Sequence, residues 1–299
     1  MMTAAKGEFG AMIARFGTGI LLLFAWAFAC ASPLGPDGEP GRFHPGKFVW
    51  FDLATDDPDG ARAFYGAVFG WRFQPVAKAP ASYALIDDGG TKIGGMFRQA
   101  RPAGAPVGSR WLPLMSVADP GKAAQYVREH GGKVLLAPVT VAGRGTHAVF
   151  RDPQGAVFGV LAASSGDPPD DPVSDGDIFW LDLFTPDPSR AADFYVGLAN
   201  YEVSETDTLA AHRRRMLSTE SIARAGVVAL PPGKQGPGWL PYILVDDVST
   251  ALDRVRRAGG KVVVEPRADL LDGNLAVVAD PNGGSVGIVN WTERVDAKK

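Results

Sequence analysis

Two aspartates, each placed two residues after a tryptophan, are the residues whose types and spacing most clearly suggest chemistry. Trp50 and Asp52 recur as Trp180 and Asp182. Residues two apart in an extended strand face the same side, so each indole shares a face with a carboxylate. Partial desolvation beside an indole raises the pKa of a carboxyl group, which would suit it to acid–base work or to holding a cationic ligand. The alternative is a strand-end carboxylate bonded to the backbone or to an arginine.

A third candidate for acid–base chemistry is His147, in the predicted strand GTHAVF. The second copy of the repeat described below has Leu275 at this position, and a lone histidine on a strand is more often hydrogen-bonded or at the surface than catalytic. The run Arg213–Arg215 is read as a solvated strand end, or as a contact for an anionic ligand. The chain contains no serine nucleophile elbow, phosphate-binding glycine loop or dinucleotide fingerprint.

Both tryptophan–aspartate pairs belong to a long internal repeat. The segment VWFDLATDDPDGARAFYGAVFGW from Val49 matches FWLDLFTPDPSRAADFYVGLANY from Phe179. Further matches follow in the same order: WLP at 111 and 239, GGKV at 131 and 259, and DPQG at 152 with DPNG at 280. This ordered self-similarity predicts two tandem copies of one domain.

Each copy predicts the same succession of elements. An alternating strand is followed by Asp-Pro, in which the aspartate caps a helix and the proline suits its first turn. A second strand follows, and a second aspartate then caps another helix, which ends at paired glycines. Further strands complete the copy, so the pattern βαβββ occurs four times along the chain. On the first strand, Phe51 and Leu53 lie opposite Trp50 and Asp52, and we expect this apolar pair to lie under the helix.

This layout, with FYxxxFGW-like helix ends, GGKV after the second helix and DPxG before the last strand, resembles the vicinal-oxygen-chelate superfamily. Its members include glyoxalase I, bleomycin-resistance proteins and extradiol dioxygenases. The resemblance covers residues 47–163 and 177–292 and implies an α+β fold of tandem glyoxalase-like domains. Each domain would contain two βαβββ modules that form a curled mixed-sheet cup with the helices outside. The family contains both enzymes and pure binding proteins, so the fold alone does not give the function.

Metal-dependent members of that family place His, Glu or Gln on the first and last strands of each module. Carried over onto this chain, these positions fall on residues without donor side chains: Trp50, Leu112, Gly159 and Gly94 or Gly95 in the first copy, and Trp180, Leu240, Gly287 and Ala225 or Gly226 in the second. A metal ion needs several convergent oxygen, sulfur or imidazole ligands. We therefore expect cups without a metal or another cofactor, in which Trp50 and Trp180 form an aromatic platform for a ligand or simply fill the cup.

The single cysteine, Cys30, follows an apolar run over residues 16–29 that has basic residues upstream, which is typical of a signal peptide. The run is shorter than the ~20 residues that span a bilayer. A small-residue step before a lone cysteine also resembles the bacterial lipobox, although Phe28 departs from it. We expect a lipoprotein anchored through Cys30 in the cell envelope, with a soluble exported protein as the alternative.

The expected divisions are a signal peptide over 1–30, a proline- and glycine-rich tether over 31–46, domains over 47–163 and 177–292, an acidic linker over 164–176 and a tail over 293–299. A net charge of −3 gives no general attraction to a phosphate backbone, so nucleic acid is not an expected partner. The leading hypothesis is a metal-free protein that binds or sequesters a small, aromatic or planar molecule. The alternatives are a lyase, isomerase or hydroxylase-like enzyme that uses Asp52, Asp182 or His147, and an envelope scaffold.

Overall fold

The computed structural model describes residues 34–77, 83–100, 108–206, 214–230 and 236–291 of the 299-residue chain. The first copy contains β1 (Phe48–Thr55), α1 (Pro58–Phe69), β2 (Arg72–Pro75), β3 (Ala84–Asp88), β4 (Thr91–Arg98), β5 (Ser109–Ser116), α2 (Pro120–Glu129), β6 (Lys133–Val141), β7 (Gly145–Arg151) and β8 (Val157–Ala163). The second contains β9 (Ile178–Thr185), α3 (Pro188–Ala199), β10 (Glu202–Thr206), β11 (Arg214–Thr219), β12 (Ile222–Ala229), β13 (Gly238–Leu244), α4 (Val248–Arg257), β14 (Lys261–Val264), a short 3-10 turn (Leu271–Gly273), β15 (Leu275–Ala279) and β16 (Ser285–Val289). The succession βαβββ predicted from the repeat is therefore present four times.

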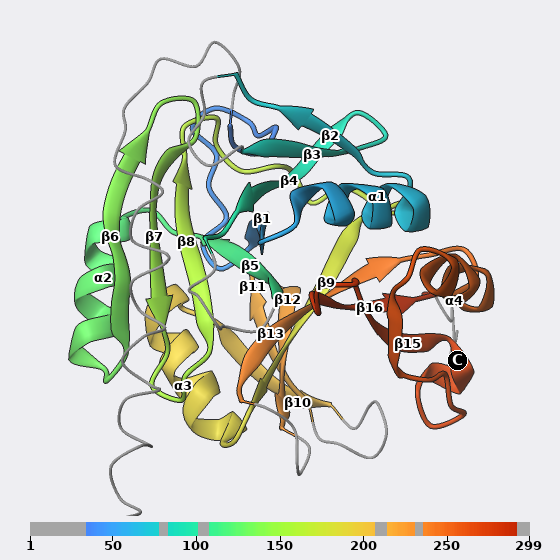
Figure 1. The fold of residues 1–299 in the computed structure, drawn as a ribbon. Coiled ribbons are helices and arrows are strands. Elements are labelled where there is room, and N and C mark those ends of the chain that lie inside the picture. The colour runs from blue at the N-terminus through green and yellow to red at the C-terminus, as the bar shows by residue number, and fades with distance from the viewer. Residues whose placement is uncertain (1–33, 78–82, 101–107, 207–213, 231–235, 292–299) are drawn as a thin grey trace, which may run out of the picture.

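Each copy forms its own eight-stranded mixed sheet (Figure 1). The strand orders are β2-β3-β4-β1-β5-β8-β7-β6 and β10-β11-β12-β9-β13-β16-β15-β14. Within the first sheet, β1 is parallel to β4 and antiparallel to β5, and β5 is parallel to β8. Both modules of a copy lie in one sheet, so each cup is formed within its own domain, and the predicted α+β fold is confirmed.

The aspartates predicted to cap the helices do so. Asp57, Asp119, Asp187 and Asp247 each accept a hydrogen bond from a backbone N–H in the first turn of the helix that follows. The first three helices also have proline in the first turn, where the missing N–H costs nothing. These local signals fix where each helix starts relative to the strand before it.

The two faces of β1 have the environments that its alternation predicts. Phe51 and Leu53 are buried in the core that also contains the apolar residues of α1. Trp50 lies on the opposite face, in a separate cluster. The core under the helices is continuous between the copies, as the ring contact of Phe48 with Trp239 at 4.9 Å between centroids shows.

The two copies contact each other through an approximate two-fold arrangement. Helix α1 packs against α4, and α2 packs against α3 (Figure 1). The Tyr65 hydroxyl donates to Asp280 at 3.2 Å, and at the equivalent place the Tyr195 hydroxyl donates to Asp152 at the same distance. The FY motif of each copy therefore binds the DPxG motif of the other copy.

The segment before β1 lies against the first domain over the residues that the structure describes. Leu34 is buried at 7% exposure, and its N–H donates to the Gly143 carbonyl at 2.7 Å. Nearer β1, the backbone N–H of His44 donates to Asp167 at 2.6 Å. The described part of the expected tether is thus packed on the domain. No helix among the described residues is long and apolar enough to cross a membrane, and the apolar run over 16–29 lies outside them.

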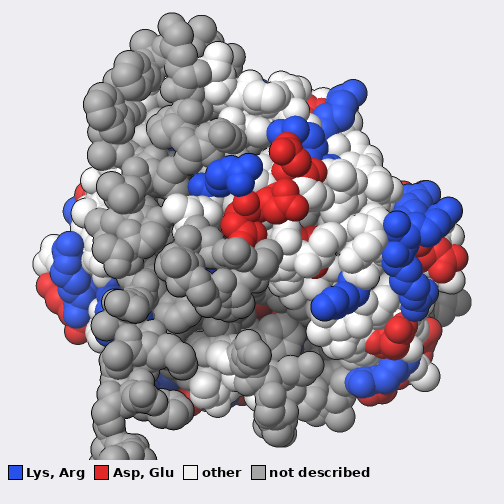
Figure 2. All heavy atoms as spheres, viewed as in Figure 1, with Lys and Arg blue, Asp and Glu red and all other residues white. Residues whose placement is uncertain are grey.

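Acidic and basic side chains are interspersed on the face of the molecule in Figure 2. Over α4, for example, Arg256 pairs with Asp253 and with Glu265. Interspersed charges of both signs do not sum to a field of one sign on this face.

Candidate functional site

In the first cup, the predicted pair of Trp50 and Asp52 is joined by two further side chains. The indole N–H of Trp50 donates to Asp52 at 2.9 Å, and the Tyr83 hydroxyl donates to the same carboxylate oxygen at 2.8 Å. Arg144 donates to the other carboxylate oxygen at 2.6 Å and to the Tyr83 hydroxyl at 2.8 Å. We call Trp50, Asp52, Tyr83 and Arg144 the first quartet.

The first quartet is almost entirely removed from water. Trp50 is 0% exposed, Asp52 1% and the Arg144 side chain 2%. Burial would lower the pKa of Arg144, but Asp52 and Tyr83 raise it above its ordinary value. Because both carboxylate oxygens of Asp52 accept strong hydrogen bonds, the carboxylate is held as a partner of the guanidinium and is not positioned as a free base.

His147, the third catalytic candidate, lies on β7 and is 1% exposed. Burial, and then the charge of Arg144, lower the pKa of His147 well below its ordinary value. The imidazole is therefore neutral at physiological pH. It lies in the protein interior on the module that also supplies Arg144.

The second cup contains the same four side-chain types. Trp180 donates to Asp182 at 3.0 Å, Arg214 donates to the other carboxylate oxygen at 2.6 Å, and Tyr242 is hydrogen-bonded to the same carboxylate. We call Trp180, Asp182, Arg214 and Tyr242 the second quartet. Burial raises the pKa of Asp182, whereas Arg214 and the hydrogen bonds from Trp180 and Tyr242 oppose that rise.

The arginine and the tyrosine of the two quartets come from different places in the repeat. Tyr83 and Arg214 occupy equivalent positions. Tyr83 lies two residues before Leu85, which pairs with Gly95, and Arg214 lies two residues before Met216, which pairs with Gly226. Tyr242 instead faces Trp180 across β9 and β13, where the first copy has a leucine. The repeat alignment therefore does not reveal either quartet beyond its tryptophan and aspartate.

The expectation that the arginine run 213–215 is solvated is wrong for Arg214. Its side chain is only 12% exposed and lies over Trp180, with 5.8 Å from the guanidinium carbon to the ring centroid. Arg215 pairs with Glu205 and is 30% exposed. Strand alternation separates the two, since adjacent residues face opposite sides of the sheet.

Glycines in both cups leave the space that the quartets use. A Cβ at Gly95 would lie 1.9 Å from the Tyr83 hydroxyl, and one at Gly226 would lie 2.2 Å from Asp182 Oδ1. Any side chain at these positions would displace the hydrogen-bonded groups. The hydrogen bonds of each quartet therefore require glycine at Gly95 and Gly226, respectively.

Comparison with protein families places both copies in one superfamily. Residues 47–160 match the Glyoxalase/Bleomycin resistance protein/Dioxygenase superfamily, and residues 179–289 match a glyoxalase-like domain. The chain belongs to the glyoxalase superfamily. Among curated members, the chain is 28% identical to "Putative glyoxylase CFP32" of Mycobacterium tuberculosis, over 81% of this chain and 94% of that protein. It is also 28% identical to the anthracycline biosynthesis protein DnrV of Streptomyces peucetius, over 84% and 96% respectively.

Solved structures of glyoxalase-superfamily proteins share the fold. An Mn(II)-bound glyoxalase from Novosphingobium aromaticivorans superposes with a TM-score of 0.57, at 16% identity and 82% coverage of each chain. A 2,2',3-trihydroxybiphenyl 1,2-dioxygenase from Sphingomonas wittichii gives 0.55, at 12% identity and coverage of 83% and 91%. At these identities the likeness concerns the fold alone.

The residues of the cups do not fit the metal that many members of this superfamily use. The positions carried over for ligands do converge in the first cup, since Asp52 is flanked by Leu112 on one strand and Gly95 on the other, and Leu114 pairs with Gly159. Those positions offer indole, isobutyl and hydrogen, none of which coordinates a cation. The Asp52 carboxylate at this place is already bonded to Arg144, Trp50 and Tyr83.

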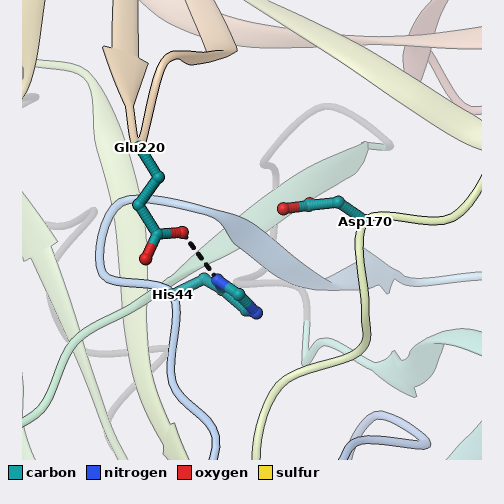
Figure 3. A group of neighbouring side chains, drawn as sticks. All are labelled: His44, Asp170 and Glu220. Atoms are coloured by element: carbon teal, nitrogen blue, oxygen red, sulfur yellow. Dashed lines mark hydrogen bonds and ion pairs between the residues drawn. The ribbon is translucent and has the colours of Figure 1, made fainter.

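Among the described residues, the one group of His, Cys, Asp and Glu with metal-ligand spacing lies outside the cups. His44, Asp170 and Glu220 offer ligand atoms within 4.8 Å of one another, and the His44 ring lies between the two carboxylates (Figure 3). Lys47 approaches Asp170 at 2.8 Å and Arg224 approaches it at 2.5 Å. These cations already neutralise the carboxylates, so we describe the group as an ion-pair cluster that joins the N-terminal segment, the linker and the β11–β12 turn.

This cluster predicts an acid-dependent loss of stability. Burial would raise the pKa of Asp170, but hydrogen bonds and charges from Arg224 and Lys47 lower it to about 2. Because the folded-state pKa is below the unfolded value of about 3.9, Asp170 stabilises the fold above that pH, and the contribution is lost as the pH falls from about 4 towards 2. Urea unfolding of the wild type and Asp170→Asn should therefore differ at pH 5 and converge near pH 2. A difference that stays constant over this range would contradict the assignment.

Of the residues predicted from the sequence, the structure brings Trp50 together with Asp52 and Trp180 together with Asp182. His147 lies near Arg144 in the first cup, whereas Cys30 lies outside the described residues. Arg144, Tyr83 and Tyr242 were not predicted. Their only sequence signal is the chemistry of a buried aspartate, which requires a cationic partner somewhere in the chain.

Proposed function

We propose that this glyoxalase-superfamily protein binds a small planar or aromatic molecule in a cup without using a metal ion. The observation that carries the proposal is that each cup holds a hydrogen-bonded quartet where the superfamily's metal ligands would be. The second quartet, which is partly exposed, presents indole and guanidinium groups that suit a flat ligand with polar substituents. The name of the relative DnrV, an anthracycline biosynthesis protein, supports a polycyclic aromatic compound as one such ligand.

Elemental analysis together with ligand titration tests this proposal. We expect purified protein to contain less than about 0.1 metal ions per chain and its tryptophan fluorescence to be unchanged by a chelator, since the described residues of the cups offer no donor set for a cation. Planar aromatic compounds should then quench that fluorescence saturably. Stoichiometric zinc, iron, nickel or manganese bound in a cup would contradict the proposal.

A second candidate function is a metal-independent enzyme, and the raised pKa of Asp182 favours it. A carboxyl group whose pKa is raised holds its proton more readily, which favours a role in proton transfer. Turnover of a bound compound that is lost in Asp182→Asn, while binding of the compound persists, would support the enzyme over the binding protein.

We also propose that the protein acts in the cell envelope, anchored to the membrane by a lipidated Cys30. The support is the signal-like run before this cysteine in the sequence. Fractionation of cells that express the full chain or Cys30→Ser tests it. Equal release of both proteins into the soluble fraction would rule out the anchor.

A further inference from the structure

The two cups differ in how they are covered. Residues 34–38, here called the strap, cross the first cup between its two modules. At one end, the N–H of Leu34 donates to the Gly143 carbonyl in the β6–β7 turn, and at the other, Asp37 pairs with Lys92 on β4. The Leu34 side chain packs in the same apolar cluster as Trp50. The chain itself thus covers the first quartet.

Within the described residues a strap lies over the first cup and not over the second, and the position of each arginine in the fold accounts for this difference. Arg144 lies at the tip of the β6–β7 turn, between Gly143 and Gly145, both of which have positive φ. A turn of this kind is held from outside by the backbone bond to Leu34. Arg214 lies on β11, where strand pairing already fixes it.

The second quartet remains partly exposed. Trp180 is half-buried where Trp50 is fully buried, and the Arg214 side chain is 12% exposed where that of Arg144 is 2%. Trp180 packs against a small buried cluster together with other partly exposed apolar side chains: Phe179, Leu240, Val264, Leu271 and Val277. An accessible indole with an apolar rim is a surface on which a flat molecule can stack.

The polar groups of the second cup indicate what that molecule carries. Arg214 uses one terminal nitrogen on Asp182, and its buried Nε has no hydrogen-bond partner among the described residues. A buried N–H without an acceptor costs free energy that a ligand oxygen would recover. Leu271, which packs on the same cluster as Trp180, and the adjacent Asp272 have φ angles of 49° and 52°, which non-glycine residues rarely adopt and which occur at ligand-binding sites.

We propose that the strap is a built-in occupant of the first cup, so that the chain binds one planar aromatic molecule with an acceptor or anionic group, in the second cup only, against Trp180 and Arg214. This inference rests on the proposed binding function. It assigns the site to one copy and sets the stoichiometry at one.

Fluorine NMR of the wild-type chain labelled with fluorotryptophan tests the assignment with both cups unaltered during the titration. The probe is naphthalene sulfonate, a planar aromatic anion, and single Trp→Phe variants assign the seven tryptophan signals. We expect the probe to shift the Trp180 signal and leave the Trp50 signal unchanged. A shift of Trp50 would overturn the inference but leave the binding function standing, whereas no binding at all would overturn both.

Variants then test the two cups separately. Trp180→Ala should weaken probe binding by about fivefold or more through lost stacking, while the matched Trp50→Phe should leave the affinity unchanged. Leu34→Ala should add a second, weaker site that is absent from the wild type. Two equivalent sites in the wild type, or a Leu34→Ala variant that still binds only one probe, would show that the strap excludes nothing.

Discussion

Replacing Arg144 with methionine is expected to lower the free energy of unfolding by about 3–5 kcal/mol. The substitution keeps most of the side-chain volume but leaves the Asp52 carboxylate buried at 1% exposure without its cation. Removing one partner of a buried ion pair costs more than the pair itself contributes, because the remaining charge is desolvated and uncompensated. Urea unfolding at neutral pH measures the loss.

Two controls separate this effect from simple loss of packing. Asp52→Asn combined with Arg144→Met should recover part of the stability, since no unpaired charge then remains. Arg214→Met should cost less, because its side chain is 12% exposed and water can solvate Asp182 in its place. If Arg144→Met costs under about 1 kcal/mol, the first quartet is not the buried ion pair described above.

The second large effect is expected at Asp280, where replacement by alanine should cost about 3 kcal/mol. Its carboxylate accepts from the backbone N–H groups of Asn282 at 2.8 Å and Gly284 at 3.0 Å, and from the Tyr65 hydroxyl of the other copy. Alanine leaves these buried donors without an acceptor. Chemical denaturation gives the total cost, and hydrogen exchange in α1 reports whether the first copy loosens as well.

The control is Tyr65→Phe, which removes the hydroxyl that donates to Asp280 and that accepts from the indole N–H of Trp111, and should cost about 1–2 kcal/mol. A larger cost of Asp280→Ala than of Tyr65→Phe would show that the turn around Asp280 contributes beyond its contact with Tyr65. Unchanged exchange in α1 of Asp280→Ala would mean that Asp280 stabilises its own turn without coupling the copies.

The fold could be predicted from the sequence because its determinants are local and occur twice. Each aspartate cap and its proline mark a helix start, and the order of the matching motifs sets the number of modules. The predicted faces of β1 follow from alternation alone. These signals depend on neighbours in the chain, so they can be read without knowing the tertiary structure.

The candidate site could be predicted only in part. Trp50 and Asp52 stand two residues apart, but Arg144 reaches Asp52 across 92 residues from a glycine-rich turn. Tyr242 and Arg214 likewise depend on which strands pair. A single sequence carries no signal for such contacts. The arginine and the tyrosine come from different modules in the two copies, so aligning the copies does not reveal these residues either.

The two-fold contact between the copies has a consequence for how this chain arose. One copy contains both halves of the contact, since Tyr65 and Asp152 stand in the places that Tyr195 and Asp280 occupy in the other. In a symmetric dimer of two identical copies, the tyrosine of each copy would therefore donate to the aspartate of the other. Joining them through residues 164–176 makes that association intramolecular and independent of concentration. Because both copies are then parts of one chain, the sequences of the two cups can diverge. One copy can serve as scaffold while the other remains open to a ligand.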